Sequence, residues 1–305
     1  MNKFWERLLA IDRRIIFVVI FLALSVPIFL QIGLPIPVTS EVQILYDALE
    51  DLSRGSRILV SCDFDPGSEP ELQPMTEAAF KYFIENDLKF VIIGLWPQGP
   101  IQANRAIEDI NESEDDFIVE NGDTLYFGED IVVVSGDTAR YGIDFINLGF
   151  QVGQELVIQR MGTSFEATFP TDKRFGLSQK EFPIMDGIYR LADFDFVFNL
   201  SAGYPGTTEW VQFAVDRFHV PVGAGNTAVQ APLAYPYLDT GQLSGILGGM
   251  KGGAEFERLV GHKARATLFM TSQTMAHIFV MLFIVVGNLA FFATMRKSDK
   301  QGLKR

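Results

Sequence analysis

Two aspartates follow an apolar segment in the stretch ILVSCDFDPGSEPE, residues 58–71. Asp63 and Asp65 are separated by one residue and are followed by a Pro-Gly pair and further acids. Paired carboxylates after a buried strand can hold Mg²⁺, which prefers oxygen ligands, and one of them can act as a nucleophile. The same residues also suit a turn, in which a carboxylate accepts backbone amides and Ser68 or Glu69 begins a helix.

Residues 58–66 resemble the first motif of the haloacid dehalogenase phosphatases. That resemblance implies that Asp63 and Asp65 hold magnesium and that one of them attacks phosphorus. The family's second motif places Ser or Thr at the end of the next strand, where this chain has Gly94, Leu95 and Trp96. The lysine of the third motif and the later acidic pair are not identifiable. We therefore favour the turn over a catalytic site.

Further polar loops follow the other apolar segments, and ligands of doubly wound α/β domains bind beyond the carboxyl ends of the strands. The loop in NLSAGYPGTTEW, residues 199–210, leads into a helix whose first amides could bind an anion, although no Lys follows its glycines. A helix cap at Thr207 or Thr208 explains the same residues. The candidate ligand-binding residues are Asp63, Asp65, Trp96, Ser201, Thr207 and Asn226.

Metal and cofactor chemistry receives little support from the remaining residues. Cys62 is the only cysteine, which excludes an internal disulfide and any multi-cysteine metal site. The histidines, His219, His262 and His277, are too scattered to indicate zinc. We predict no catalytic residue, no metal and no cofactor.

The central part of the chain alternates between apolar strands and amphipathic helices. Strands are predicted at 57–62, 89–96, 142–149, 195–201 and 220–225, and helices at 40–54, 70–88 and 206–219. Strands that are apolar throughout and are separated by such helices indicate parallel pairing covered on both faces. We predict an α/β fold with a doubly wound, mostly parallel sheet of about five or more strands. Asn121-Gly122, within residues 117–135, predicts an inserted hairpin.

Two long apolar segments flank this domain. Residues 15–34 contain no charged side chain, and residues 274–295 contain only His277 as a titratable group. About 20 such residues are needed for a helix to cross a bilayer. We therefore predict a transmembrane helix at 15–34, an α/β domain at 35–273, a second transmembrane helix at 274–295, and terminal segments at 1–14 and 296–305.

Basic residues collect at the outer ends of both predicted spans. Before the first stand Lys3, Arg7, Arg13 and Arg14, and after the second stand Arg296, Lys297, Lys300, Lys304 and Arg305. Because short basic flanks stay in the cytoplasm, both termini are predicted to be cytoplasmic, with residues 35–273 periplasmic or extracellular. Residues 15–295 carry 16 Lys and Arg against 35 Asp and Glu. This acidity argues against nucleic acid as a partner.

Glycines recur every four residues at Gly241, Gly245, Gly249 and Gly253, with a second row that includes Gly248 and Gly252. In a helix each glycine costs about 0.8–1 kcal/mol relative to alanine, so these rows predict close approach by another element, within the chain or between chains. An irregular glycine loop is the alternative. Asn288 beside Gly287 predicts contact between membrane helices.

The sequence therefore favours a non-enzymatic, membrane-anchored structural or assembly subunit. Its predicted partners are the lipid bilayer and other membrane-protein subunits or copies of itself. One alternative is an extracytoplasmic domain that binds or senses a ligand at the strand-end loops. The other is a metal-dependent hydrolase or transferase that uses Asp63 and Asp65.

Overall fold

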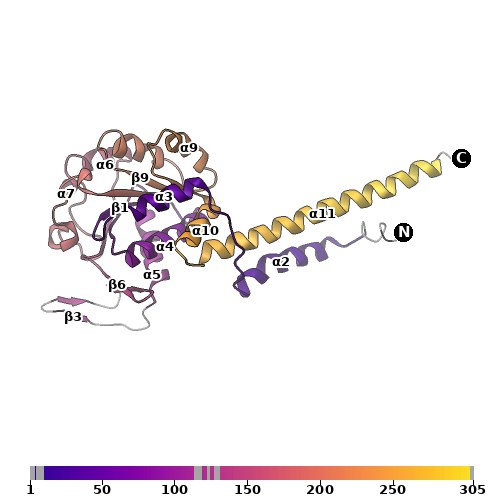
Figure 1. Cartoon of the computed structure of the whole chain (residues 1–305), viewed down its shortest axis with the longest axis horizontal. Coiled ribbons are helices and arrows are strands. Elements are labelled where there is room, and N and C mark those ends of the chain that lie inside the picture. The colour runs from indigo at the N-terminus through magenta and orange to yellow at the C-terminus, as the bar shows by residue number, and fades with distance from the viewer. Residues whose placement is uncertain (1–3, 5–9, 113–118, 122–123, 127–130, 303–305) are drawn as a thin grey trace. The chain divides into compact units, whose positions relative to one another are not determined.

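The computed structural model describes residues 4, 10–112, 119–121, 124–126 and 131–302, with side chains for 4, 10–112 and 131–293. The chain divides into two compact units, which are the domain Ile36–Ala266 and a unit made of the segments Met1–Pro35 and Thr267–Arg305. The domain holds the sheet and most of the helices (Figure 1).

A parallel sheet of six strands forms the centre of the domain. The strands are β1 (Arg57–Asp63), β2 (Lys89–Gly94), β7 (Phe145–Phe150), β8 (Phe196–Ser201), β9 (Val222–Asn226) and β10 (Ile246–Gly248). Their order across the sheet is β10-β9-β8-β1-β2-β7. This is the 3-2-1-4-5-6 order of a doubly wound sheet, and the winding reverses between β1 and β8. The predicted α/β class and parallel sheet are confirmed.

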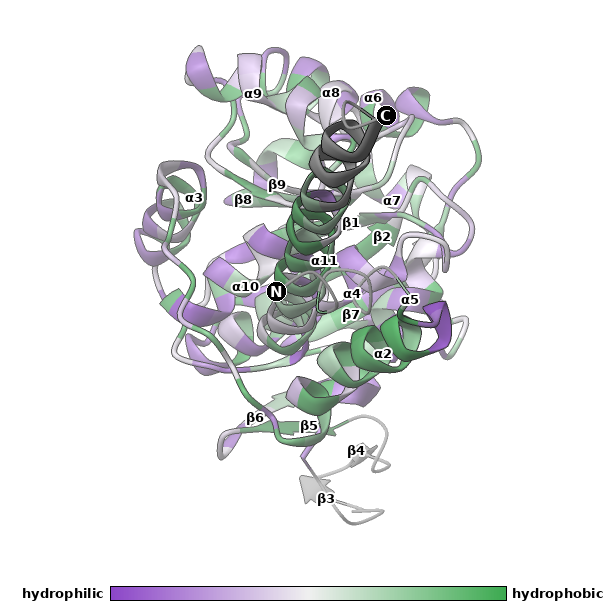
Figure 2. Ribbon diagram, turned by 90° about the vertical axis from the view of Figure 1, so that its right-hand side faces the viewer, coloured by the Kyte–Doolittle hydropathy of each residue, from purple (hydrophilic) through white to green (hydrophobic). Residues whose placement is uncertain are grey.

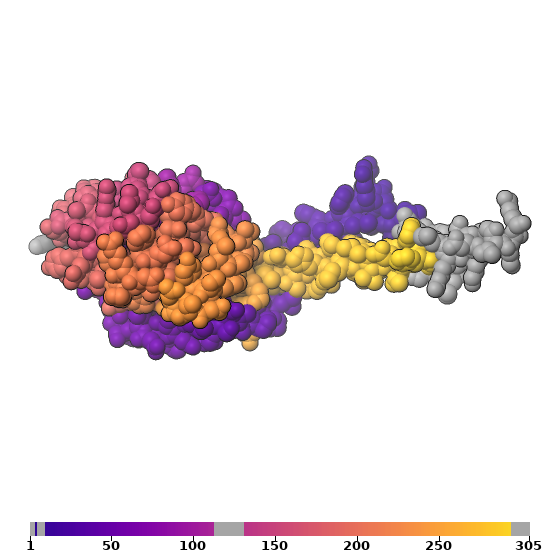
Figure 3. All heavy atoms as spheres, turned by 90° about the horizontal axis from the view of Figure 1, so that it is seen from above, coloured from indigo at the N-terminus to yellow at the C-terminus, as the bar shows by residue number. Residues whose placement is uncertain are grey.

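Helices cover both faces of the sheet, as the buried strands require. One layer contains α4 (Glu69–Glu85), α5 (Gly99–Ile110) and α10 (Gly249–Leu259), and the other contains α6 (Glu155–Met161), α8 (Thr207–Trp210) and α9 (Ala231–Asp239) (Figure 2). Figure 3 views the molecule from the side on which α6 and α9 lie in Figure 1. The shorter elements are α7 (Phe165–Thr168), the π-helical η5 (Val211–Val215), and the 3₁₀ turns η2 (Gln179–Glu181), η3 (Pro183–Met185) and η4 (Leu191–Asp193).

Aromatic side chains fill much of the space between the sheet and the α4 layer. The ring of Phe90 stacks on Phe80 at 4.8 Å and on Phe145 at 5.5 Å between centroids, and Phe83 meets Phe198 edge-on at 5.9 Å. Helix α3 (Ser40–Glu50) buries Val42, Leu45 and Leu49, and it packs against β10 and α10. The apolar face predicted for residues 40–54 is therefore part of the core.

Two small antiparallel hairpins are inserted between α5 and β7. They pair β3 (Val119–Asn121) with β4 (Thr124–Tyr126), and β5 (Ile131–Val134) with β6 (Asp137–Arg140). Each is a separate sheet of two strands. The predicted hairpin corresponds to β3 and β4, whereas the turn residue Gly122 lies outside the described residues.

One described segment, Arg265–Ala293, is long and apolar enough to cross a membrane. It belongs to helix α11 (Arg265–Gly302), which begins earlier than the predicted boundary at residue 274. The first predicted span is not confirmed, because α2 (Arg13–Phe29) has 17 residues and is about 25 Å long at 1.5 Å per residue. Helix α2 and the part of α11 whose side chains are described are largely apolar (Figure 2).

The glycine rows do not form one helix. Only the part from Gly249 onward is helical, since Gly248 ends strand β10 and Gly241 and Gly245 adopt positive φ angles of 74° and 100°. A Cβ at Gly245 would overlap the backbone of Leu45, and one at Gly253 would lie 3.2 Å from Met75. At these two positions α3 and α4 of the same chain approach the glycine backbone closely. Asn288 lies exposed on α11.

Replacing Gly245 with alanine should lower the free energy of unfolding by about 3 kcal/mol or more, because the added methyl overlaps α3 and the φ angle is unfavourable. Gly241→Ala is the matched control, since its φ of 74° is similarly positive and no atom lies within 4 Å of the added Cβ. It should cost about 1–2 kcal/mol. Thermal unfolding of the full-length protein in mild detergent measures both. Equal losses would contradict the close contact.

Candidate functional site

The carboxylate of Asp63 lies at the carboxyl end of β1, at the point where the winding of the sheet reverses. It is fully buried. Its Oδ1 accepts the backbone N–H of Leu95 at 2.7 Å, and its Oδ2 accepts the side-chain amide of Asn199 at 2.7 Å and the indole N–H of Trp210 at 3.1 Å. The Ser61 hydroxyl donates to the same carboxylate at 2.8 Å. Both carboxylate oxygens are thus held by groups from β1, β8, α8 and the residue that follows β2.

A second set of polar contacts continues from Asn199 along the ends of β8 and β9. The Thr207 hydroxyl donates to Oδ1 of Asn199 at 2.8 Å and accepts the side-chain amide of Asn226 at 2.9 Å. The Ser201 hydroxyl donates to the carbonyl of Gly203 at 3.1 Å. The structure therefore brings four of the six predicted ligand residues, Asp63, Ser201, Thr207 and Asn226, into one buried region, where their side chains hydrogen-bond to other groups of the protein.

The other two predicted residues lie closer to the surface. Asp65 accepts the backbone N–H of Gly67 at 3.0 Å, which is the turn contact that the sequence suggested. Trp96 is partly buried, and its indole donates to the carbonyl of Pro205 at 3.1 Å. A Cβ at Gly203 would lie 3.3 Å from Trp96. Trp96 therefore joins the loops after β2 and β8.

Trp210 is buried next to Asp63 at the winding reversal, the part of a doubly wound domain where ligands usually bind. Its side chain is among the largest that are fully buried, and its indole N–H is fixed on Asp63. The first turn of α4 carries Glu69 and Glu71, and these acids oppose binding of a phosphate at that helix start. Asn199 and Trp210 were not among the predicted site residues. In the sequence Asn199 reads as part of a buried strand, and Trp210 reads as part of the apolar face of a helix.

Burial raises the pKa of Asp63 to about 6, against the opposing effect of the hydrogen bonds from Leu95, Ser61, Trp210 and Asn199. The carboxylate is ionised at pH 7 and is satisfied by donors. Within the described residues, no group of three or more His, Cys, Asp or Glu side chains is placed to hold a metal ion. A nucleophilic role for Asp63 would require it to exchange its donors for a substrate.

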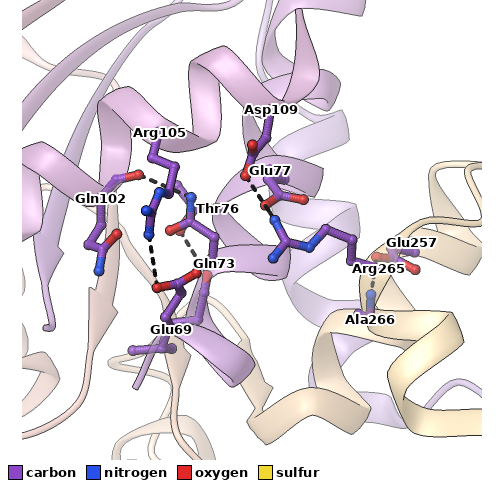
Figure 4. A network of polar contacts seen from close by, with 11 residues as sticks. Glu69, Gln73, Thr76, Glu77, Gln102, Arg105, Asp109, Glu257, Arg265 and Ala266 are labelled. Atoms are coloured by element: carbon purple, nitrogen blue, oxygen red, sulfur yellow. Dashed lines mark hydrogen bonds and ion pairs between the residues drawn. The ribbon is translucent and has the colours of Figure 1, made fainter. Parts of the chain in front are cut away.

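A second polar cluster lies where the domain leads into α11. Two buried glutamates of α10 bind the backbone at the domain's two ends (Figure 4 shows Glu257). Glu255 accepts the N–H of Thr39 at 2.9 Å, and Glu257 accepts the N–H groups of Ala264 at 3.1 Å and Ala266 at 2.8 Å. The carboxylate of Glu257 therefore caps the start of α11, where free N–H groups favour a negative charge.

Arg265, the first residue of α11, extends between α4 and α5 (Figure 4). Its guanidinium donates to Glu77 at 2.6 Å and to Asp109 at 2.8 Å. Burial raises the pKa of Glu77 to about 8; the charge of Arg265 acts against this rise and Asp109 adds to it. Glu77 therefore retains a proton at neutral pH in the folded state.

Asp63→Asn should lower the free energy of unfolding by about 2–4 kcal/mol, because the new NH₂ group faces N–H donors that lose a charged acceptor. Asp65→Asn is the control: asparagine supports the same turn, so a change within about 0.5 kcal/mol is expected. Thermal unfolding of the full-length protein at pH 7 gives the comparison. Equal stability of Asp63→Asn and the unaltered protein would show that the carboxylate does not hold the strand ends together.

Glu77 should make the domain less stable as the pH rises. The pKa of Glu77 is about 8 in the folded protein, against 4.5 for an ordinary glutamate. Its stabilising contribution is therefore complete below pH 4.5 and is lost as the pH rises through 8. Glu77→Gln keeps the neutral form. It should match the unaltered protein near pH 4 and exceed its stability by about 2–4 kcal/mol near pH 9.

Glu69→Gln provides the control for this measurement, because Glu69 forms an ion pair with Arg105 that is open to solvent. Its effect should stay within about 0.5–1 kcal/mol at both pH values. If Glu77→Gln were less stable than the unaltered protein at pH 9, the ionised Glu77–Arg265 pair would be the stabilising form, and the protonated form would be excluded.

No family model matches this chain, and neither a curated protein nor a solved structure matches it. The function is therefore inferred from the geometry described above.

Proposed function

We propose that this chain is a non-enzymatic, membrane-anchored subunit of a larger membrane assembly. In this proposal α2 and α11 both lie in the membrane, both termini are cytoplasmic, and the α/β domain is periplasmic or extracellular. The observation that carries the non-enzymatic part is that the Asp63 carboxylate, at the winding reversal, is engaged by protein donors that include the buried indole of Trp210. With this carboxylate engaged by the protein, we assign the interactions of the domain to its outer surface.

Anchoring is supported by both terminal helices. The apolar segment Arg265–Ala293 meets the length and composition of a membrane span. On α2 the large side chains of Ile15, Phe17 and Phe21 are 57–64% exposed, which suits contact with lipid or with another apolar helix. The basic residues at the outer ends of the two apolar segments support cytoplasmic termini.

Ligand binding at the strand-end loops is the second candidate function. It is favoured by Trp96, which is partly exposed beside Gly203 and Gln230 and offers an aromatic face at the edge where ligands of this fold bind. The metal-dependent hydrolase is less well supported, since Asp63 is bonded on both oxygens and Asp65 closes a turn.

The mass of the native particle tests the assembly proposal. The full-length protein is extracted from its own membrane in mild detergent, and the protein mass and content of the particle are measured. We expect a particle of several chains. Thermal shifts with Mg²⁺, inorganic phosphate and nucleotides form the control, and no saturable stabilisation is expected. A particle that contains one chain only would refute the assembly, and stabilisation by one of these ligands would favour a binding or catalytic domain.

A further inference from the structure

Five large apolar side chains protrude from the loops and first helical turns beyond the carboxyl ends of β7, β8 and β9. We call these residues, together with Glu155 and Glu209, the edge surface; its exposed apolar members are Val229 (82%), Val152 (78%), Leu233 (63%), Tyr204 (57%) and Leu156 (52%). Single exposed apolar residues are common on soluble domains, whereas a group of them on adjacent loops is typical of an interaction site.

Contacts between the loops make the edge surface continuous. The Tyr204 hydroxyl donates to Glu155 at 2.6 Å, which joins the loop after β8 to the start of α6. Gly203 precedes Tyr204 in the loop after β8. A Cβ on Gly203 would lie 3.9 Å from the side-chain amide of Gln230, so this loop approaches the loop after β9. Helix α8 also contacts both α6 and α9. The exposed side chains of the three loops therefore belong to one stretch of surface.

The charges of the edge surface have one sign. Residues 151–156, 202–209 and 227–235 contain Glu155 and Glu209 and no Lys or Arg. Both glutamates are partly exposed. The remaining residues of the three segments are apolar, small or uncharged polar. A complementary partner must therefore present apolar groups together with positive charge.

We propose that the edge surface docks a protein segment that carries both apolar and basic side chains and belongs to another subunit; this rests on the proposed role in an assembly. The same carboxylates argue against two other occupants. Anionic lipid headgroups would be repelled by them. A second copy bound around a two-fold axis would place the same acidic surface against itself.

Photo-crosslinking in native membranes tests this proposal. A photoreactive amino acid replaces Val229 in the full-length protein, and the same probe at Tyr189 is the matched control. Tyr189 is 73% exposed but precedes β8 and so lies at the opposite edge of the sheet. We expect an adduct from position 229, absent from position 189, and mass spectrometry of that adduct should find Lys or Arg in the crosslinked partner segment.

Charge reversal supplies the second readout. In the Val229 probe protein, Glu155→Lys should lower the adduct yield by about tenfold. Glu166→Lys, a reversal on the neighbouring short helix α7, should leave the yield unchanged, and thermal unfolding verifies that both variants are folded. An adduct with a second copy, an adduct with lipid, no adduct, or a yield that Glu155→Lys does not lower would each overturn the proposal. A particle of several chains that gives no adduct at 229 would refute this surface alone and leave the assembly standing.

Discussion

The buried carboxylate of Asp63 is the constraint on which the middle of the domain depends. A charge removed from water is tolerated only when hydrogen bonds replace its solvation, and here the donors come from Ser61, Leu95, Asn199 and Trp210. These donors come from β1, β8, the residue after β2, and helix α8. Satisfying one carboxylate therefore fixes the ends of β1, β2 and β8 and positions α8 above them.

The same constraint determines what the domain has available for function. Doubly wound sheets bind ligands where the winding reverses. In this chain the buried indole of Trp210 donates to Asp63 at that point and cannot leave without removing a donor from the carboxylate. The polar residues that could have bound a ligand, among them Thr207 and Asn226, are engaged with one another. Exposed apolar side chains appear one layer further out, on the loops around this buried region. Recognition by the outer surface is therefore the function that this arrangement favours.

The sequence predicted the sheet well, because uniformly apolar segments such as 90–93 have few alternatives to a buried strand. It did not predict β10, whose three residues, Ile246 to Gly248, are hidden among glycines that resemble a helix repeat. Residue 245 must be glycine partly because a Cβ there would overlap Leu45 of α3, which lies some 200 residues earlier in the chain. The sequence also did not reveal that Asn199 and Trp210 donate to Asp63. A local apolar pattern does not show which buried polar group a side chain will contact in the folded protein.

Helix α10 connects these features. Its first residue, Gly249, has a positive φ angle and would meet Ala228 of the loop after β9 if it carried a Cβ. Further along, Glu255 and Glu257 bind the backbone at Thr39 and Ala266, where the domain continues toward α2 and α11. One buried helix thus contacts a loop beside the edge surface and both ends of the domain. Because both glutamates are fully buried, a displacement of α10 would take backbone N–H donors away from two buried carboxylates, so the helix is expected to move with the segments that it binds.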